Sequence, residues 1–297
     1  MGKTYTGVDI GDSSIKLAVS DGQSVSKVAI EMLPEGLVAD GRIVSHDAMA
    51  DFIKSVVRSI GGVSKDVAFV VPGSDSLFRR LSLPAMTEKE LRLNLPYEFR
   101  DYISQGKDRY VYDYAMLGMR NDADGQPEGM DLLAVAAPKQ AIADYTEMFR
   151  RAGLKLKVAL PEQAAYQNLV GGNPRALANC CVIDFSHHMT KLHFFLDGAY
   201  DVARVIEIGG IDIDRAIANE YGVDEHVADQ YKRTDYQGAQ GSEAARAVYQ
   251  SIAVEIGRAL NFYGFNNPDV VIEVAYCCGG GLLLDLSLIH ISEPTRP

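Results

Sequence analysis

The sequence contains one ten-residue pattern twice, and this repeat restricts the fold more than any other feature. VDIGDSSIKL begins at Val8 and IDFSHHMTKL begins at Ile183. Aligned without a gap, Asp9 falls on Asp184 and Lys16 on Lys191, since 184 less 9 and 191 less 16 both give 175. Both copies lie in the same order of strand, turn, strand, turn and strand, which indicates a duplicated lobe. Chance similarity, or Asp used only for local hydrogen bonding at a turn, is the alternative.

Hydrophobic periodicity and turn residues predict the elements around the two copies. Ser45 is expected to cap a helix that stops at Gly61, and a capping box from Thr87 to Glu90 opens another, which Pro96 should break or kink near Leu95. The remaining predicted helix covers 139–152. Predicted strands cover 4–9, 15–20, 24–31, 66–71, 78–83, 132–137, 180–184, 190–196 and 201–208.

These elements predict an α/β protein of two lobes. The first lobe covers residues 1–172 and contains a small inserted subdomain at about 74–137. The second covers 173–285. Residues 286–297, LSLIHISEPTRP, resemble a translated sequencing adapter and are interpreted as a non-native tail, with a genuine short tail as the alternative.

Charge and hydropathy exclude several function classes. The net charge of −11 and the pI near 5.0 disfavour a nucleic-acid surface, which needs clustered Lys and Arg. No run approaches the roughly 20 apolar residues that span a bilayer, and we expect a cytoplasmic protein. The cysteines form two adjacent pairs, Cys180-Cys181 and Cys277-Cys278, without metal-ligand spacing, so buried free thiols are expected.

The first copy has the parts of a phosphate-binding turn. A tight Gly/Ser turn presents backbone N–H groups to an anion, and hydroxyls or a Lys add charge-assisted contacts. Aspartates on two facing strands can hold a hydrated Mg²⁺ that also contacts phosphates. The residues concerned are Gly11, Asp12, Ser13, Ser14 and Lys16 for phosphate, and Asp9 and Asp184 for the metal.

Two glycine runs complete the pattern. Gly209-Gly210 follows the second copy, and Gly279-Gly280-Gly281 follows an apolar stretch, where glycine lets the backbone pass close to a ring or phosphate. Each run is also consistent with a plain turn between elements.

The order of these parts resembles the actin-like (ribonuclease H-like) ATPase fold, and within it the PilM family of type IV pilus assembly proteins. The resemblance extends to Asp285, and its most specific segments belong to the inserted subdomain. The matching segments are GVDIGDSSIK at 7–16, VVPGSDSLFRRLSLPAMTEKEL at 70–91, VYDYAMLG at 111–118, IEIGGIDIDRAIA at 206–218, EIGRALNFYGF at 255–265 and CCGGG at 277–281.

The resemblance implies an ATP and Mg²⁺ site. Asp9 and Asp184 would hold the metal through water, and Glu162 would orient the attacking water. The other implied nucleotide contacts are Gly11, Asp12, Ser13, Ser14, Lys16, Ser186, Thr190, Gly209, Gly210, Lys232, Gly279, Gly280 and Gly281.

The chain departs from the family pattern in three places. His187, His188 and Met189 are bulkier than the small residues usual in the second hairpin, which puts phosphate packing and hydrolysis there in doubt. Pro96 lies in a helix that is unbroken in relatives. Relatives also continue beyond the triple glycine, so the second lobe is expected to be truncated.

The function implied is a scaffold at the inner-membrane assembly platform of a type IV pilus or a related competence or secretion system. ATP would set lobe closure, with weak or absent hydrolysis, and a PilN-like membrane protein would dock its short cytoplasmic segment near the inserted subdomain. No nucleic acid and no direct membrane insertion are expected, and self-association stays open. The alternatives are an FtsA-like filament-forming cell-division protein and a sugar-kinase-type phosphotransferase.

Overall fold

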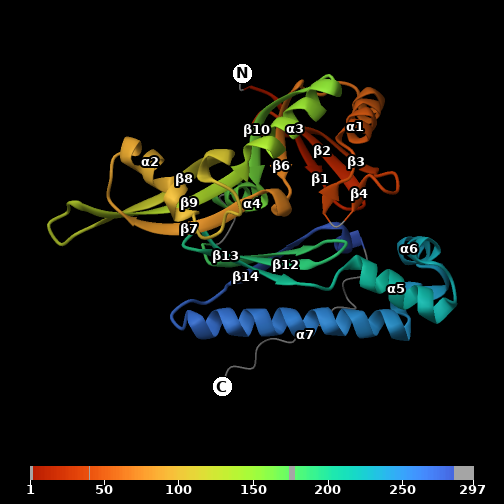
Figure 1. Cartoon of the computed structure of the whole chain (residues 1–297). Coiled ribbons are helices and arrows are strands. Elements are labelled where there is room, and N and C mark those ends of the chain that lie inside the picture. The colour runs from red at the N-terminus through yellow and green to blue at the C-terminus, as the bar shows by residue number, and fades with distance from the viewer. Residues whose placement is uncertain (1–2, 40, 174–177, 284–297) are drawn as a thin grey trace. The chain divides into compact units, whose positions relative to one another are not determined.

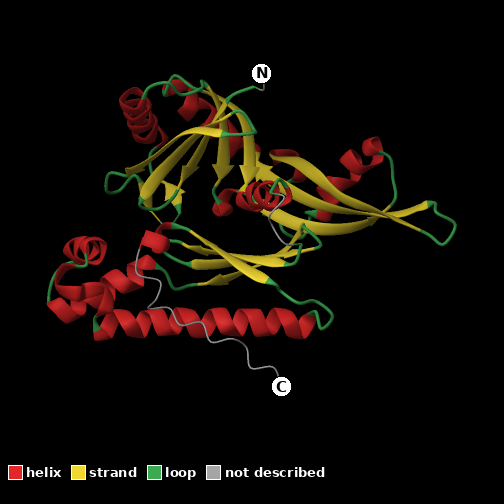
Figure 2. Ribbon diagram, turned by 180° about the vertical axis from the view of Figure 1, so that it is seen from behind, coloured by secondary structure: helices red, strands yellow, loops and turns green. Residues whose placement is uncertain are grey.

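The computed structural model describes residues 3–39, 41–173 and 178–283. The chain forms two compact units that divide between Leu169 and Val170, and each unit is described by itself (Figure 1). Both units contain a sheet with helices packed on it, as the colouring by element type shows (Figure 2). The tail at 286–297 lies outside the described residues.

A five-stranded sheet forms the centre of the first unit, in the order β10-β6-β1-β2-β3. Strands β1, β2 and β3 form an antiparallel meander, and β6 and β10 add to it in parallel. Parallel pairing requires crossover connections, which the helices supply. The bounds are β1 Tyr5–Ile10, β2 Ser14–Ser20, β3 Val25–Met32, β6 Asp66–Val71 and β10 Lys155–Pro161, with a small β4–β5 ladder at Val38–Ala39 and Arg42–Ile43.

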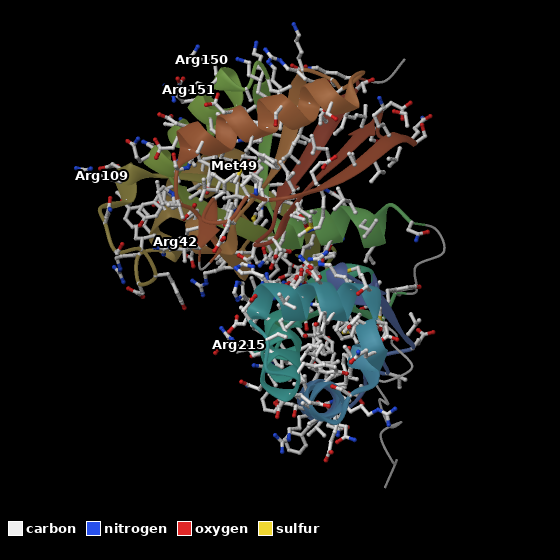
Figure 3. All side chains as sticks on the ribbon, turned by 90° about the vertical axis from the view of Figure 1, so that its right-hand side faces the viewer. Arg42, Met49, Arg109, Arg150, Arg151 and Arg215 are labelled. Carbon is white, nitrogen blue, oxygen red and sulfur yellow. The ribbon has the colours of Figure 1, made fainter. Side chains whose placement is uncertain are left out.

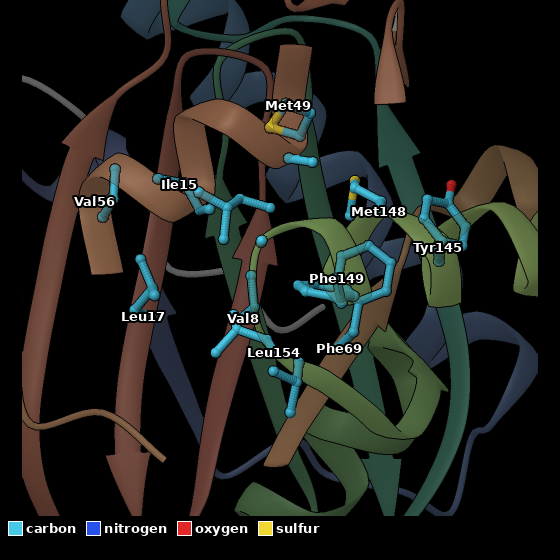
Figure 4. Packing of buried hydrophobic residues seen from close by; sticks show 14 of the residues in the cluster. Val8, Ile15, Leu17, Met49, Val56, Phe69, Tyr145, Met148, Phe149 and Leu154 are labelled. Carbon is cyan, nitrogen blue, oxygen red and sulfur yellow. The ribbon is translucent and has the colours of Figure 1, made fainter. Parts of the chain in front are cut away.

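Two helices cover one face of this sheet, α1 (His46–Ile60) and α3 (Lys139–Arg151). The Ser45 side chain caps α1 by accepting from the Ala48 N–H at 3.3 Å, and Gly61 follows its end at φ +59°, as the sequence predicts. The apolar sides of α1 and α3 bury Met49 and Phe149 against the strands (Figure 4). Figure 3 shows Met49 directed inward, with Arg150 and Arg151 at the surface.

The inserted subdomain is a three-stranded antiparallel sheet, β7-β9-β8, with α2 packed on one face. The Thr87–Glu90 capping box forms, because the Glu90 N–H donates to the Thr87 hydroxyl and the Thr87 N–H donates to the Glu90 carboxylate. Of the two effects predicted for Pro96, the break near Leu95 is wrong, since α2 continues through Pro96 to Glu98, and the kink stays a prediction. The bounds are β7 Leu77–Pro84, α2 Glu88–Glu98, β8 Tyr110–Asn121 and β9 Pro127–Pro138.

Packing explains the helix that continues past Pro96. Proline removes one N–H and crowds the carbonyl four residues earlier, which costs most in the middle of a long helix. Pro96 lies in the last turn, and the apolar side chains around it, Leu91, Leu95 and Phe99, are buried against the sheet. Burial of this face holds the last turn in place.

The second unit contains a four-stranded sheet in the order β13-β12-β11-β14. Its strands β11, β12 and β13 form an antiparallel meander, and β14 is parallel to β11. The long helix α7 packs Ile252, Ile256 and Tyr263 on this sheet. The bounds are β11 Cys180–Phe185, β12 Thr190–Leu196, β13 Ala199–Ile206, α5 Gly210–Tyr221, α6 Glu225–Thr234, α7 Glu243–Asn266 and β14 Val274–Cys278, and α4, Glu162–Gly171, spans the boundary between the units.

The two meanders repeat each other residue by residue, which confirms the predicted duplication. Asp9 pairs with Lys16, and Asp184 pairs with Lys191. Even an irregularity recurs, because the register shifts between Val19 and Ser20 in one copy and between Phe194 and Phe195 in the other. All these positions keep the offset of 175, so strand pairing as well as sequence pattern is duplicated.

The four cysteines are thiols rather than disulfides, but only one pair is buried as expected. Cys180 and Cys181 lie inside the second sheet, whereas Cys277 is exposed and Cys278 is partly exposed. The difference arises because β14 is the outermost described strand of its sheet. Within the described residues, no helix is both long and apolar enough to cross a membrane.

Candidate nucleotide-binding hairpins

The first hairpin brings together the residues predicted for phosphate. Asp9 is the second-last residue of β1 and pairs with Lys16 of β2, and the Lys16 Nζ lies 3.1 Å from the Asp9 Oδ2 in a half-exposed ion pair. The Gly11 N–H donates to the Ser14 carbonyl at 3.0 Å and closes a tight turn with Asp12 and Ser13 at its tip. The turn therefore presents short polar side chains beside one carboxylate and one ammonium group.

The second hairpin has the same backbone with different side chains. The Ser186 N–H donates to the Met189 carbonyl at 3.0 Å, which is the equivalent of the bond that closes the first turn. The Ser186 hydroxyl also donates to the Asp184 Oδ1 at 3.1 Å. Thr190 is buried and donates to the Ile208 carbonyl at 2.9 Å, so its hydroxyl supports the chain that follows β13.

His187 and His188 occupy the tip of this turn. Their ring centroids lie 4.8 Å apart in an edge-to-face arrangement. Among the residues that the structure describes, no group of three or more His, Cys, Asp or Glu could hold a metal ion.

Gly209 and Gly210 hold the start of α5 against the second turn. A Cβ on Gly209 would lie 2.5 Å from the His187 carbonyl oxygen and 2.5 Å from the Met189 nitrogen, which no larger residue allows. The Gly210 N–H donates to the Ser186 carbonyl at 3.1 Å, and the Ile211 N–H donates to the His187 carbonyl at 2.8 Å. The glycine pair thus serves close packing of helix on turn.

This packing orients the peptide groups of the turn. The carbonyls of Ser186 and His187 face α5, and in a trans peptide the N–H lies opposite the C=O. The N–H groups of His187 and His188 consequently face away from α5. Successive N–H groups on one side of a turn form a site suited to an anion.

The triple glycine lies beside Asp184. Strand β14 runs parallel to β11, with Cys278 opposite Asp184, and Gly279 follows at φ +96°. A Cβ on Gly279 would approach the Asp184 Oδ1, and one on Gly281 would lie 2.6 Å from the Phe185 Cβ. Both positions require glycine, because any side chain would collide with the strand that carries the carboxylate.

The second unit offers only a small cavity at these residues. A pocket of about 20 Å³ is lined by Ser186, Thr190, Gly209, Gly210 and Gly281, among others. This volume holds about one water molecule. Within the described part of this unit, these residues lie together but do not enclose a nucleotide.

Lys232 takes part in a buried ion pair. Its Nζ lies 2.7 and 2.8 Å from the two carboxylate oxygens of Asp214, 3.2 Å from the Asp229 Oδ1 and 3.3 Å from the Gly210 carbonyl. Burial raises the pKa of Asp214, and the charge of Lys232 opposes that rise. Two of these contacts, to the Asp214 Oδ2 and the Gly210 carbonyl, are hydrogen bonds. The predicted role of Lys232 at the nucleotide stays a prediction.

Glu162 is the first residue of α4 and directly follows β10. In the first unit it lies in the strand-to-helix connection after β10, two strands away from β1 in the sheet order. Its role as a water-orienting residue stays a prediction.

Sequence reasoning missed Asp212 and Asp214. The Asp212 carboxylate accepts from the Gly209 N–H at 2.9 Å and caps α5. Its signal was present, because Asp three residues after Gly209 is the spacing of a capping box. Asp214 gave no comparable signal, because a charged residue becomes a buried partner only through tertiary contacts.

Two sheets that repeat one meander, each with a parallel strand beside its first strand, define an actin-like ATPase fold with an inserted subdomain. The family described as type IV pilus assembly protein PilM matches residues 7–295, and the chain belongs to it. It is a PilM-type protein with a role in type IV pilus assembly.

Solved structures that share this fold include a pilus biogenesis complex and an ethanolamine utilization protein. One is a PilM-PilN type IV pilus biogenesis complex, 24% identical with a TM-score of 0.77, over 97% of this chain and 83% of the matched chain. The other is the ethanolamine utilization protein EutJ from Carboxydothermus hydrogenoformans, 14% identical with a TM-score of 0.61 and the same coverage. Among curated proteins, no sequence matches this chain.

Proposed function

We propose that this protein is an ATP-binding scaffold of the inner-membrane platform that assembles the type IV pilus. The observation that carries the proposal is the pair of equivalent hairpins, each closed by the same backbone bond and each bearing an Asp–Lys register pair. Family membership favours the pilus role over the cell-division and sugar-kinase alternatives.

In this proposal, the turn N–H groups and Lys16 bind the phosphates. The carboxylates of Asp9 and Asp184 are the oxygen donors that suit Mg²⁺, which neutralises phosphate charge when bound and usually keeps several waters. The glycine at 279 is consistent with this assignment, since a side chain at that position would collide with the Asp184 carboxylate. A nucleotide that uses both hairpins would favour lobe closure by its higher affinity for the closed form.

Titration of a fluorescent ATP analogue with Mg²⁺ tests the site. Asp9→Ala and Asp184→Ala should each weaken binding by about tenfold or more, because removal of one carboxylate loses the metal contact. Asp51→Ala is the matched control, since Asp51 is exposed on α1 and belongs to neither turn. Equal affinity in all four proteins, or no saturable binding, would contradict the proposal.

The rate of phosphate release from ATP distinguishes a scaffold from an enzyme. Histidines at the second tip replace small residues, and we expect slow release that Glu162→Gln lowers further. Release at the 1–100 s⁻¹ typical of kinases would instead favour a phosphotransferase or an active ATPase.

The proposed partner is the cytoplasmic N-terminal segment of a PilN-like membrane protein, docked near the inserted subdomain. Support comes from the similarity of this chain to a PilM-PilN complex and from exposed apolar side chains on and after α2, Leu93, Tyr97 and Tyr102. Such a surface suits a short apolar peptide.

Binding of a labelled peptide that corresponds to the cytoplasmic N-terminal segment of the PilN-like protein tests the docking surface. Leu93→Ser should weaken binding several-fold, because Leu93 is 64% exposed on α2 and would lose its apolar contact. Val254→Ser, an exposed apolar position on α7, is the control. If ATP leaves the peptide affinity of the wild-type protein unchanged, nucleotide and partner are not coupled and the proposed gating fails.

A further inference from the structure

Within the described chain, the outer edge of β3 is an unpaired strand edge, with a register shift at its start, between Val25 and Lys27. β3 ends the first sheet, and no strand among residues 3–39, 41–173 and 178–283 pairs with its outer side. Proteins usually protect such edges with inward charges, proline or bulges, because the exposed backbone groups can pair with another chain. Here Val28 and Ile30 lie on one face of the strand and are 64% and 62% exposed. Among the described residues, the edge is unpaired beyond the register shift, and one face of the strand is apolar.

The residues of β3 are complementary to themselves. A two-fold axis perpendicular to the sheet pairs two copies of a strand symmetrically about one central residue and keeps each face together. About Ala29, Val28 faces Ile30 of the second copy, and Lys27 faces Glu31 of the second copy. Apolar side chains meet on one face and opposite charges meet on the other, and both pairings stabilise antiparallel strands.

Among the pairings centred on Val28, Ala29 or Ile30, only the one about Ala29 brings Lys27 opposite Glu31. When the centre moves by one residue in either direction, Lys27 faces Ala29 or Leu33, and neither charge meets its opposite. The sequence of β3 thus specifies one arrangement of two copies.

Lys27 is positioned to take part. Its Nζ donates to the Ile60 carbonyl at 3.2 Å and to the Gly61 carbonyl at 2.6 Å, which also caps the end of α1. An ammonium group has three donors, so one remains for a carboxylate across the edge.

The equivalent strand of the second unit lacks this complementarity. β13 also ends its sheet, and the offset of 175 places Arg204 where β3 has Ala29. A two-fold pairing about Arg204 would oppose two like charges, which destabilises the pair. The Arg204 guanidinium also lies over the Phe262 ring, 4.5 Å from its centroid. The two duplicated edges therefore differ at their centres, where β13 has the charged Arg204 and β3 has Ala29.

We propose that two copies of this chain associate through antiparallel pairing of their β3 strands about Ala29, which joins their first sheets into one. The occupant of the edge is a second copy rather than a foreign peptide, because Lys27 and Glu31 each face the opposite charge when β3 pairs with an identical strand. This association uses no residue of the nucleotide site, so its test does not depend on ATP binding.

Analytical ultracentrifugation over a range of concentrations tests the proposal. Wild-type protein should form a dimer, whereas Lys27→Glu and Glu31→Lys should each raise the dissociation constant by about tenfold or more, since each opposes like charges across the pair. An equal mixture of the two variants should dimerise again, because opposite charges then meet at both positions. This rescue separates a lost contact from a misfolded variant.

Two further variants locate the surface. Ala29→Arg transfers the equivalent residue of β13 to β3 and should abolish the dimer, and Val205→Lys, at an exposed position of β13, should leave it intact. Circular dichroism checks that each variant is folded. Wild-type protein that stays monomeric, a mixture of the charge variants that stays monomeric, or a dimer that Val205→Lys disrupts would overturn the proposal.

Discussion

The two meanders, 5–32 and 180–206, share a backbone but differ in what supports it. Their pairing register, turn closure and bulge agree at an offset of 175. The first turn carries short polar residues, and its Ser13 carbonyl accepts from the Leu33 N–H at 3.0 Å. The second carries two histidines and supports the start of α5. Strand alternation and a tight turn therefore specify the hairpin, while its tip and surroundings are free to diverge.

The second unit also buries polar groups that the first does not need. Lys232 and Asp214 form a buried ion pair, and His193 is fully buried where the first copy has Ala18. Buried polar groups are costly when they lose a partner or gain a charge. The second unit should accordingly be more sensitive to substitution than the first, and four predictions test this difference.

The largest effect is expected at Lys232. Lys232→Met would leave the Asp214 carboxylate buried without its partner, at a cost of about 3–5 kcal/mol in the free energy of unfolding. Urea unfolding measures it. The double variant Lys232→Met/Asp214→Leu should recover much of the loss, and a single variant as stable as wild type would show that the pair contributes nothing.

Acid should destabilise the second meander through His193. Burial lowers the pKa of His193 to about 4 from an ordinary 6.5, so the folded protein holds the neutral ring and the unfolded chain binds the extra proton. Stability is full above pH 6.5 and falls by about 3 kcal/mol as the pH drops toward 4.

Thermal melts of wild type and His193→Gln between pH 7 and pH 4 measure this contribution. The difference between the two proteins should change with pH in that window. Parallel curves would mean that His193 does not titrate on unfolding.

Gly11 in the first turn and Gly209, which packs against the second turn, should differ in their tolerance of an added methyl group. Gly209→Ala would force backbone apart at 2.5 Å and should cost roughly 2–3 kcal/mol. Gly11→Ala meets only the flexible Lys16 Nζ at 3.3 Å and the Ser14 carbonyl at 3.4 Å, and should cost less than about 1 kcal/mol. Chemical denaturation of both variants compares them directly, and equal losses would contradict the unequal packing.

The smallest effect is expected from the exposed ion pair of the first hairpin. Lys16→Ala should change the free energy of unfolding by less than about 1 kcal/mol, because both side chains are more than 40% exposed and solvent screens the pair. The same variant should weaken binding of the ATP analogue. A large stability loss would assign Lys16 a structural role instead.

Much of the fold could be predicted from local signals. Helix ends were predicted from bonds within a few residues, at Ser45, Gly61 and the Thr87–Glu90 capping box. The alternation of apolar and polar residues predicted the strands of both meanders. The prediction failed at Pro96, where burial of Leu91, Leu95 and Phe99 outweighs a local penalty. It also failed at Cys277, whose exposure depends on the position of β14 in the sheet order.

By itself, the sequence determined the duplication, the position of the two Asp–Lys pairs and the need for glycine beside them, because these follow from patterns shorter than one hairpin. Only the tertiary structure decided that Lys232 is enclosed by Asp214 and Asp229, that Gly209 packs on the histidine turn, and that β3 and β13, which differ at Ala29 and Arg204, both end their sheets. These are contacts between segments distant in sequence, and burial and strand order arise only when such segments meet.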